Sequence, residues 1–186
     1  KRKSNCVIKA GEPESYPVFR LLHKEGRLYM RLLIKQRVFA WGDTYDIYDE
    51  AGNVKYVVKA EIFALGHQLH VFDAMGNKVG RINQKLLTLL PQFEITVGGR
   101  MLGTIKKQFT FFVPKYDIDY NGWHAEGDVL GWNYEVCSGP RTVMQVSKQW
   151  LSWGDTYTID IVDARDELEA IMLVIAIDAA NCDNNE

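Results

Sequence analysis

The sequence predicts a mainly β protein in which about a dozen short antiparallel strands surround one buried helix. Two observations lead to this prediction. From residue 30 onward, short runs that alternate apolar and polar residues are separated by turns rich in glycine and asparagine, the pattern of consecutive hairpins. Near the C-terminus, residues 168–180 read Leu-Glu-Ala-Ile-Met-Leu-Val-Ile-Ala-Ile-Asp-Ala-Ala. A helix that is apolar on every side must be buried on every side.

The apolar run at 168–180 is shorter than a membrane span, which needs about 20 apolar residues, whereas this run has about 13. Asp166 is predicted to cap the helix, with Glu169 three residues later in an acidic variant of the capping box. Asp178 interrupts the run. Because a buried carboxylate is costly unless it is paired, we expect an arginine or lysine partner for it at the mouth of the sheet.

The strands follow one another in hairpins. Two turns share the sequence Asp-x-x-Gly-Asn, at 49–53 and 73–77, where glycine suits a left-handed position. An apolar run at 86–90 is stopped by Pro91, and we expect a short turn of helix there. The expected strands are 30–36, 44–48, 54–62, 69–72, 79–84, 93–97, 101–105, 109–113, 116–120, 123–126, 132–136, 142–147 and the last within 150–161.

One internal repeat stands out. Trp-Gly-Asp-Thr-Tyr occurs at 41–45 and again at 153–157. In each copy Gly-Asp supplies a turn, while Trp and Tyr can pack as an aromatic pair across it. The repeat predicts that the sheet contains two related strand-turn-strand units, and we interpret it as architecture and not as a binding site.

Length and composition predict one domain and exclude some partners. The chain has 186 residues and a net charge of −2, so no overall basic field would attract nucleic acid. Three cysteines without a Cys-x-x-Cys pair are typical of a reduced, cytoplasmic protein without structural zinc. We expect residues 1–29 to be an N-terminal extension, either a translated leader or sequence added for expression, with a genuine extension as the alternative. Residues 30–182 form the domain, and 183–186 a polar tail.

Four segments carry a resemblance to a known family: Met-Arg-Leu-Leu-Ile-Lys-Gln-Arg-Val-Phe from residue 30, Gly-Arg-Ile-Asn-Gln-Lys-Leu-Leu from 80, Phe-Thr-Phe-Phe-Val-Pro-Lys-Tyr from 109, and Trp-Gly-Asp-Thr-Tyr from 153. Together with the apolar helix, they resemble bacterial members of the LURP-one-related family across residues 30–180. That family is similar to the phospholipid scramblases and to the C-terminal domain of Tubby proteins. The resemblance implies a closed antiparallel barrel of twelve strands around a central hydrophobic helix.

The resemblance implies less about function. Tubby domains bind phosphoinositide head groups, scramblases are linked to calcium-dependent lipid movement, and plant relatives to pathogen response. No motif here matches the Tubby head-group residues. We therefore expect a module that binds a lipid head group or a hydrophobic ligand at the membrane surface, which would make the protein cytoplasmic and membrane-peripheral. The alternatives are a protein-interaction or regulatory scaffold, whose protein partner is unknown, and a scramblase-like movement of lipid.

Enzyme motifs are absent from the sequence. It contains neither a Gly-x-Ser-x-Gly elbow nor a phosphate-binding Gly-x-x-x-x-Gly-Lys-Ser/Thr loop. No nucleophile can be paired with a base. We therefore expect a non-enzymatic protein that needs no cofactor.

Four aspartates are weak candidates for calcium. They lie just before the final helix, at the position of the segment proposed to bind calcium in scramblases, but without the glycine and glutamate register of an EF-hand loop. We expect no metal site, and the capping interpretation is favoured. The four residues are Asp155, Asp160, Asp163 and Asp166.

Basic residues are the candidate ligands for a lipid head group. One group flanks an aromatic run at 109–112 that could provide an apolar foothold; a second lies on the strand that begins near Val79. The alternative is an ordinary solvated barrel exterior. The candidates are Lys106, Lys107 and Lys115 in the first group, and Arg81 and Lys85, together with Lys78, in the second.

Overall fold

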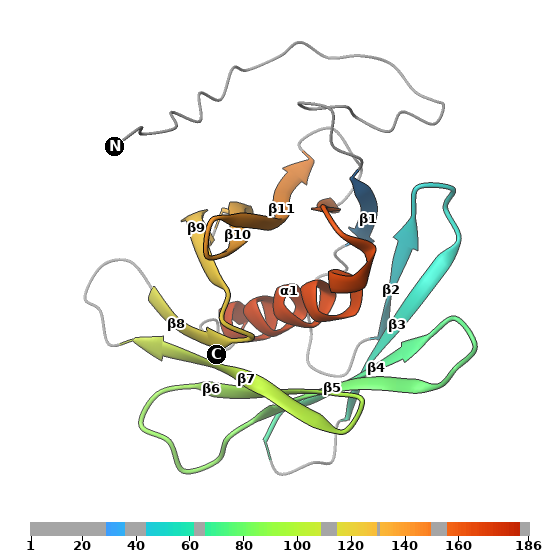
Figure 1. The fold of residues 1–186 in the computed structure, drawn as a ribbon. Coiled ribbons are helices and arrows are strands. Elements are labelled where there is room, and N and C mark those ends of the chain that lie inside the picture. Colours follow the sequence, from blue (N-terminus) through green and yellow to red (C-terminus); the bar gives the residue numbers. More distant parts are fainter. Residues whose placement is uncertain are drawn as a thin grey trace, which may run out of the picture.

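The computed structural model describes residues 29–35, 44–61, 66–108, 115–129, 131–149 and 156–182. Within these ranges the chain forms twelve strands, one short 3₁₀ turn and one α-helix (Figure 1). The predicted strand at 109–113 lies outside the described residues. The strands are β1 (Met30–Lys35), β2 (Thr44–Asp49), β3 (Val54–Glu61), β4 (Gln68–Asp73), β5 (Lys78–Gln84), β6 (Gln92–Val97), β7 (Arg100–Gln108), β8 (Lys115–Tyr120), β9 (His124–Asp128), β10 (Asn133–Ser138), β11 (Arg141–Gln149) and β12 (Thr156–Ile161).

All twelve strands belong to one antiparallel sheet that curls into a nearly closed barrel. Their order is β8-β7-β6-β5-β4-β3-β2-β1-β12-β11-β10-β9. Every pair except β1 with β12 joins strands consecutive in sequence, as expected for a meander. The barrel stops short of closure because β8 and β9 lie at the two edges of the sheet, and the turn that joins them holds one isolated bridge, between Tyr120 and Trp123. The predicted fold class is confirmed, with closure incomplete at this seam.

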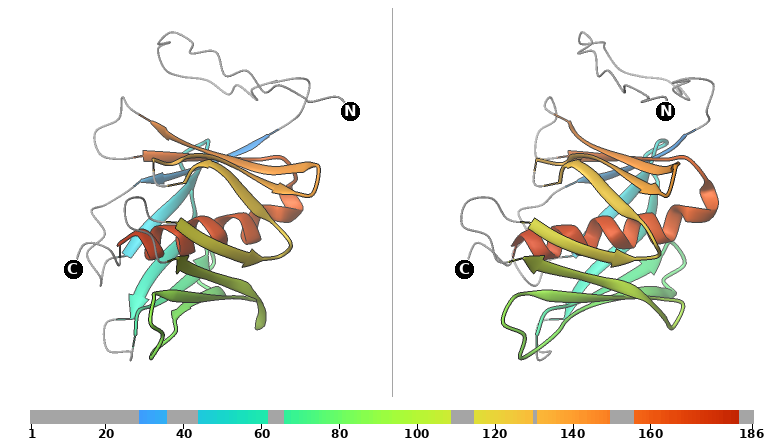
Figure 2. Two further views of the ribbon diagram at one scale, coloured as in Figure 1. Left: turned by 90° about the vertical axis from the view of Figure 1, so that its left-hand side faces the viewer. Right: turned by 60° about the vertical axis from the view of Figure 1, so that its left-hand side comes forward.

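The apolar run forms the helix α1 (Glu167–Cys182) inside the barrel. Every residue from Ala170 to Ala180 is buried. Figure 2 shows α1 between the wall of β9–β12 and the wall of β5–β8. The inward-facing residues of the strands, among them Leu32, Val71 and Ile95, complete one continuous core with the helix. An all-apolar helix is stable in this position because the sheet removes its whole surface from water.

Polar contacts fix the start of α1 against β8 on one side and β3 on the other. The Tyr120 hydroxyl donates a hydrogen bond to the Glu169 carbonyl oxygen over 2.9 Å. On the other side, the Tyr56 hydroxyl donates to Oε1 of Glu167 over 3.1 Å, and Lys55 Nζ lies 2.5 Å from the same oxygen. These bonds set the depth at which the helix enters the barrel.

The cap before α1 differs from the prediction. Asp163, not Asp166, acts as the capping residue: its side chain accepts a hydrogen bond from the backbone N–H of Arg165 and caps the 3₁₀ turn η1 (Ala164–Asp166). The Asp166 carboxylate instead contacts Arg141 of β11. An extra turn of 3₁₀ helix therefore lies between the cap and the α-helix, a common feature of helix N-termini.

The two predicted Asp-x-x-Gly-Asn turns have matching geometry. In each, the aspartate Oδ1 accepts the backbone N–H of the asparagine four residues later over 2.8 Å: Asn53 to Asp49, and Asn77 to Asp73. The glycine of each turn has a positive φ, 82° in one and 84° in the other, a conformation that glycine adopts without strain. The side-chain bonds are those that favour aspartate in turns.

The connections between strands divide the barrel into two ends. Because neighbouring strands are antiparallel, successive connections alternate between these ends. At one, the turn end, the connections are short: 50–53, 74–77, 98–99, 121–123 and 139–140. At the other, the loop end, they are longer except for 129–132: 36–43, 62–67, 85–91, 109–114, 129–132 and 150–155. Helix α1 follows β12 at the turn end and runs toward the loop end.

The sequence repeat maps onto two neighbouring hairpins. One copy spans the connection from β1 to β2 and the other the connection from β11 to β12. Since β12 pairs with β1, the two hairpins lie side by side in the sheet, and Ile34 of β1 is placed between Ile47 and Tyr157. The repeated Trp-Gly-Asp segments themselves lie outside the described residues.

Candidate functional site

The corner where β5 ends, β6 begins and β7 ends brings two of the predicted lysines together. The backbone N–H of Lys85 donates to the Gln92 carbonyl over 2.7 Å, and that of Lys107 to the Pro91 carbonyl over 2.9 Å. Gln92 also pairs with Lys106 in the sheet register. The base of the connection 85–91 is therefore tied to both neighbouring strands, and the exposed side chains of Lys85 and Lys106 belong to the same corner.

The other predicted basic residues lie elsewhere. Lys107 shares the inward face of β7 with buried Ile105, because alternate residues of a strand face the same side, whereas Lys106 faces out. Arg81 is exposed on β5, but four residues of extended strand place it roughly 13 Å from Lys85. Lys115 begins β8 opposite Gln108, and its side chain lies outside the described residues, as do Phe109, Phe111 and Phe112.

Acidic residues reduce the positive charge of the outer wall. Lys85 Nζ lies 2.9 Å from Oε1 of Glu94 on β6. Lys106 pairs with Asp117 of β8 in the sheet register. The two lysines at the corner therefore remain solvated cations with carboxylates nearby, and the wall around them carries mixed charge.

The connection 85–91 exposes leucines at this corner. Leu87 and Leu89 are fully exposed and Leu86 is half exposed. The expected turn of helix is absent: residues 86–90 form turns and bends, and Leu87 has a left-handed backbone with φ 61°. We call Lys85, Leu86, Leu87, Leu89 and Lys106 the leucine corner. The apolar run is evident in the sequence, but its exposure was not predicted; the adjacent Lys85 and Pro91 were the available signals.

The leucine corner combines two properties that suit one class of ligand. The free energy falls when large exposed apolar side chains leave water, and lysines attract anions. A surface that presents both, with exposed leucines on a connection and lysines at its base, is matched by the anionic head groups and acyl chains of a phospholipid layer.

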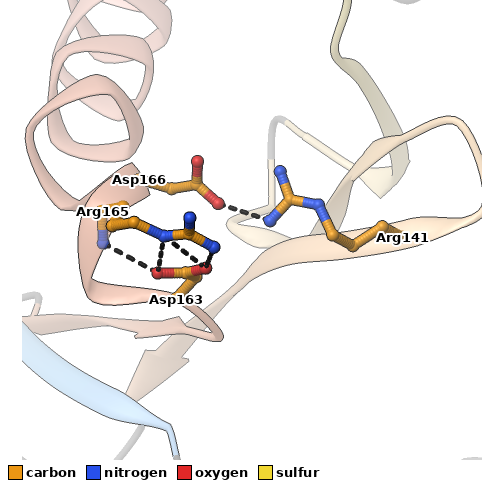
Figure 3. Close-up of polar contacts among 4 residues, drawn as sticks. All are labelled: Arg141, Asp163, Arg165 and Asp166. Atoms are coloured by element: carbon orange, nitrogen blue, oxygen red, sulfur yellow. Dashed lines mark hydrogen bonds and ion pairs between the residues drawn. The ribbon is translucent and has the colours of Figure 1, made fainter.

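Two of the aspartates considered for calcium, Asp163 and Asp166, are bound by arginines (Figure 3). Asp163 Oδ2 lies 2.6 Å from Arg165 Nη2, and Asp166 Oδ2 lies 2.5 Å from Arg141 Nη1. Hydrogen bonds from the Arg165 side chain lower the pKa of Asp163 to about 2.

The other two aspartates do not complete a calcium site. Asp160 Oδ1 lies 2.6 Å from Nε of Arg31 on β1, and Asp155 lies outside the described residues. In the described ranges, no three His, Cys, Asp or Glu side chains are grouped so that they could hold a metal ion.

Asp178, near the end of α1, lacks the basic partner that was expected. Among the described residues, no hydrogen bond or ion pair joins its carboxyl group to another side chain. Burial raises the pKa of Asp178 to about 7. Burial, and after it the charge of Asp178, raises the pKa of Tyr134, whose buried hydroxyl has no hydrogen-bond partner among the described residues. An uncharged, protonated carboxyl is cheaper to bury than a carboxylate, which explains how this position tolerates an acid without an arginine.

No helix in the described part of the chain is both long enough and apolar enough to cross a bilayer.

Comparisons with known proteins agree with the fold. The family model described as LURP-one-related matches residues 30–178. The uncharacterised protein YxjI of Bacillus subtilis (strain 168) is 35% identical over 149 residues, which is 80% of this chain and 92% of that protein. The X-ray structure of an Arabidopsis thaliana protein superposes with a TM-score of 0.57 at 19% identity, covering 81% of this chain and 91% of that one.

Proposed function

The chain belongs to the LURP-one-related family, and on this premise we propose that it is a non-enzymatic binding domain that attaches to an anionic phospholipid surface through the leucine corner. One observation carries the proposal: fully exposed Leu87 and Leu89 project next to exposed Lys85 and Lys106. Exposed leucines of this kind in a contiguous group mark interaction sites, and the lysines select an anionic partner.

The carboxylates at the turn end of the barrel support attachment through the loop end. Its tight turns carry the carboxylates of Asp49 and Asp73, and hydrogen bonds from Asn53 and Asn77 lower the pKa of each, which keeps both ionised. An anionic surface repels these carboxylates. Attachment through the loop end therefore places these two carboxylates away from the lipid, together with exposed Lys78 and Arg100 of the same end.

Vesicle co-sedimentation tests the proposal. We expect the protein to sediment with phosphatidylcholine vesicles that contain phosphatidylserine, less with phosphatidylcholine alone, and less as salt is added, because salt screens the attraction. Each lysine near an anionic surface contributes about 1 kcal/mol, so the double variant Lys85→Gln/Lys106→Gln should bind roughly tenfold more weakly or worse.

A charge-matched control is available at the turn end. The variant Lys78→Gln/Arg100→Gln removes two exposed basic residues there and should bind like the wild type. Equal losses in both variants would mean that overall charge, and not the leucine corner, drives binding. Absence of sedimentation under every condition would contradict the lipid proposal.

A protein-interaction scaffold is the second candidate, and the seam between β8 and β9 favours it. In the described residues each of these strands pairs on one side only, apart from the bridge at Tyr120 and Trp123. Free strand edges can accept an extended segment of another protein. Slower hydrogen exchange of β8 or β9 amides in the presence of a partner would support this role, and unchanged exchange with a bound partner would oppose it.

A further inference from the structure

We infer that Leu87 and Leu89 enter the apolar layer of an anionic bilayer, so that the ligand of the leucine corner is the membrane itself and not a soluble head group. This inference rests on the proposed function and specifies its partner. It also fixes an orientation, with the loop end of the barrel facing the membrane.

The conformation of the connection 85–91 is the first argument. Leu87 adopts a left-handed backbone, which costs a residue with a side chain about 1–2 kcal/mol, yet its side chain is fully exposed. No burial of Leu87 among the described residues offsets this strain. Backbone strain of this kind persists where the surroundings impose it and is concentrated at binding sites. A bilayer would supply the missing burial.

The hydrogen bonds that hold the base of the connection 85–91 are the second argument. The hydrogen bonds from Lys85 to Gln92 and from Lys107 to Pro91 hold both ends of the connection, and the Thr88 hydroxyl donates to the Lys85 carbonyl over 3.3 Å. The leucines therefore project from a short, tied segment. A preorganised segment loses little conformational entropy when it binds, so more of the free energy of leucine burial is available for attachment.

The position of the two lysines relative to the leucines is the third argument. Lys85 begins the connection and Lys106 lies beside its far end, across from Gln92, while Leu87 and Leu89 occupy the middle. When the leucines are in the acyl region, cations at the base meet the phosphate layer, since the long lysine side chain can extend toward head groups. A soluble head group would use the lysines but would leave the leucines in water.

Exposed apolar residues at the turn end provide the comparison. Met75 is 84% exposed and Leu87 is fully exposed, so the two are similar in exposure and size. Met75, however, lies in the turn that contains Asp73, whose carboxylate disfavours approach to anionic lipid. Position 75 is therefore a matched control for insertion.

The test uses an environment-sensitive fluorophore attached to a single cysteine. In the full chain carrying Cys6→Ser, Cys137→Ser and Cys182→Ser, the label is placed through Leu87→Cys or through Met75→Cys. With vesicles containing phosphatidylserine, we expect a blue shift and quenching by acyl-chain nitroxides at position 87, and neither at position 75. Soluble O-phospho-L-serine should produce no shift.

The outcomes separate the inference from the function on which it rests. If the labelled protein sediments with vesicles while the label at 87 stays in water, insertion is wrong and charge-driven attachment stands. If both labels shift equally, the orientation is wrong. If the chain with neither label nor cysteine replacements fails to sediment, the proposed function and the insertion both fall.

Discussion

The thioether of Met172 on α1 occupies the space that a Cβ atom on Gly80 of β5 would need: its Cε lies 2.7 Å from that position. Real Cβ atoms are not found so close to other heavy atoms. The helix approaches this wall closely because the strand carries a glycine there. Both residues are buried, so Met172 has little room in which to move.

Replacing Gly80 with alanine should therefore destabilise the barrel. Overpacking a filled core typically costs about 1–3 kcal/mol, and we expect Gly80→Ala to lower the free energy of unfolding within that range in urea titrations. The double variant Gly80→Ala/Met172→Ala is the control. Met172→Ala alone leaves a cavity, but the added alanine should then cost much less than in the wild type. An unchanged cost in both backgrounds would show that Met172 is not the obstacle.

Asp178 should make stability depend on pH. Its pKa is raised from 3.8 to about 7 by burial, so the folded state binds a proton more tightly than the unfolded state does. Stability is then fully present below the unfolded pKa and is lost as pH rises through the folded pKa. A shift of this size corresponds to up to roughly 4 kcal/mol.

The variant Asp178→Asn isolates this contribution. We expect it to match the wild type at about pH 4 and to be more stable at about pH 8, with most of the gain developing between these values. The difference in the free energy of unfolding between variant and wild type is measured by urea titration at each pH. In this difference, the contributions of groups that titrate in both proteins cancel. A gain that is the same at both pH values, or a loss at the higher one, would contradict an unpaired buried carboxyl.

The arginine partners of the acidic segment should keep calcium from stabilising the fold. The carboxylates of Asp160, Asp163 and Asp166 are engaged by Arg31, Arg165 and Arg141. A calcium ion would have to displace these cations and would meet their repulsion. We expect millimolar calcium to leave the melting temperature unchanged, with magnesium as the control. A rise specific to calcium would show that the segment binds it.

Local sequence patterns were sufficient to predict the hairpins and the buried helix, whereas the family resemblance supplied the strand count and the barrel. The helix expected at 168–180 is observed as Glu167–Cys182, because a run that is apolar on all sides has one stable environment. The Asp-x-x-Gly-Asn turns were predictable because aspartate and glycine supply bonds and conformations that act within five residues. In contrast, the incomplete seam at Tyr120 and Trp123 depends on how the whole sheet curls, which no local pattern encodes.

The candidate site was predictable only in part. Alternation along β7 implies that Lys106 and Lys107 face opposite sides, so the prediction that both belong to one basic patch is wrong. The exposure of Leu87 and Leu89 was not predictable from hydropathy, since a run of leucines usually indicates a core. Arg165, the partner of Asp163, is close to it in sequence and could be predicted locally. Arg141, the partner of Asp166, comes from another strand, so local sequence could not predict it.

The most direct test of membrane attachment removes the exposed leucines. We would measure co-sedimentation with phosphatidylserine-containing vesicles for the wild type, for Leu87→Ser/Leu89→Ser, and for Met75→Ser/Met101→Ser, which removes two exposed apolar side chains at the turn end. Burying a leucine is worth about 1.5–3 kcal/mol, so the leucine variant should bind at least tenfold more weakly, and the methionine variant should bind like the wild type. Equal binding by all three proteins would contradict attachment through the leucine corner.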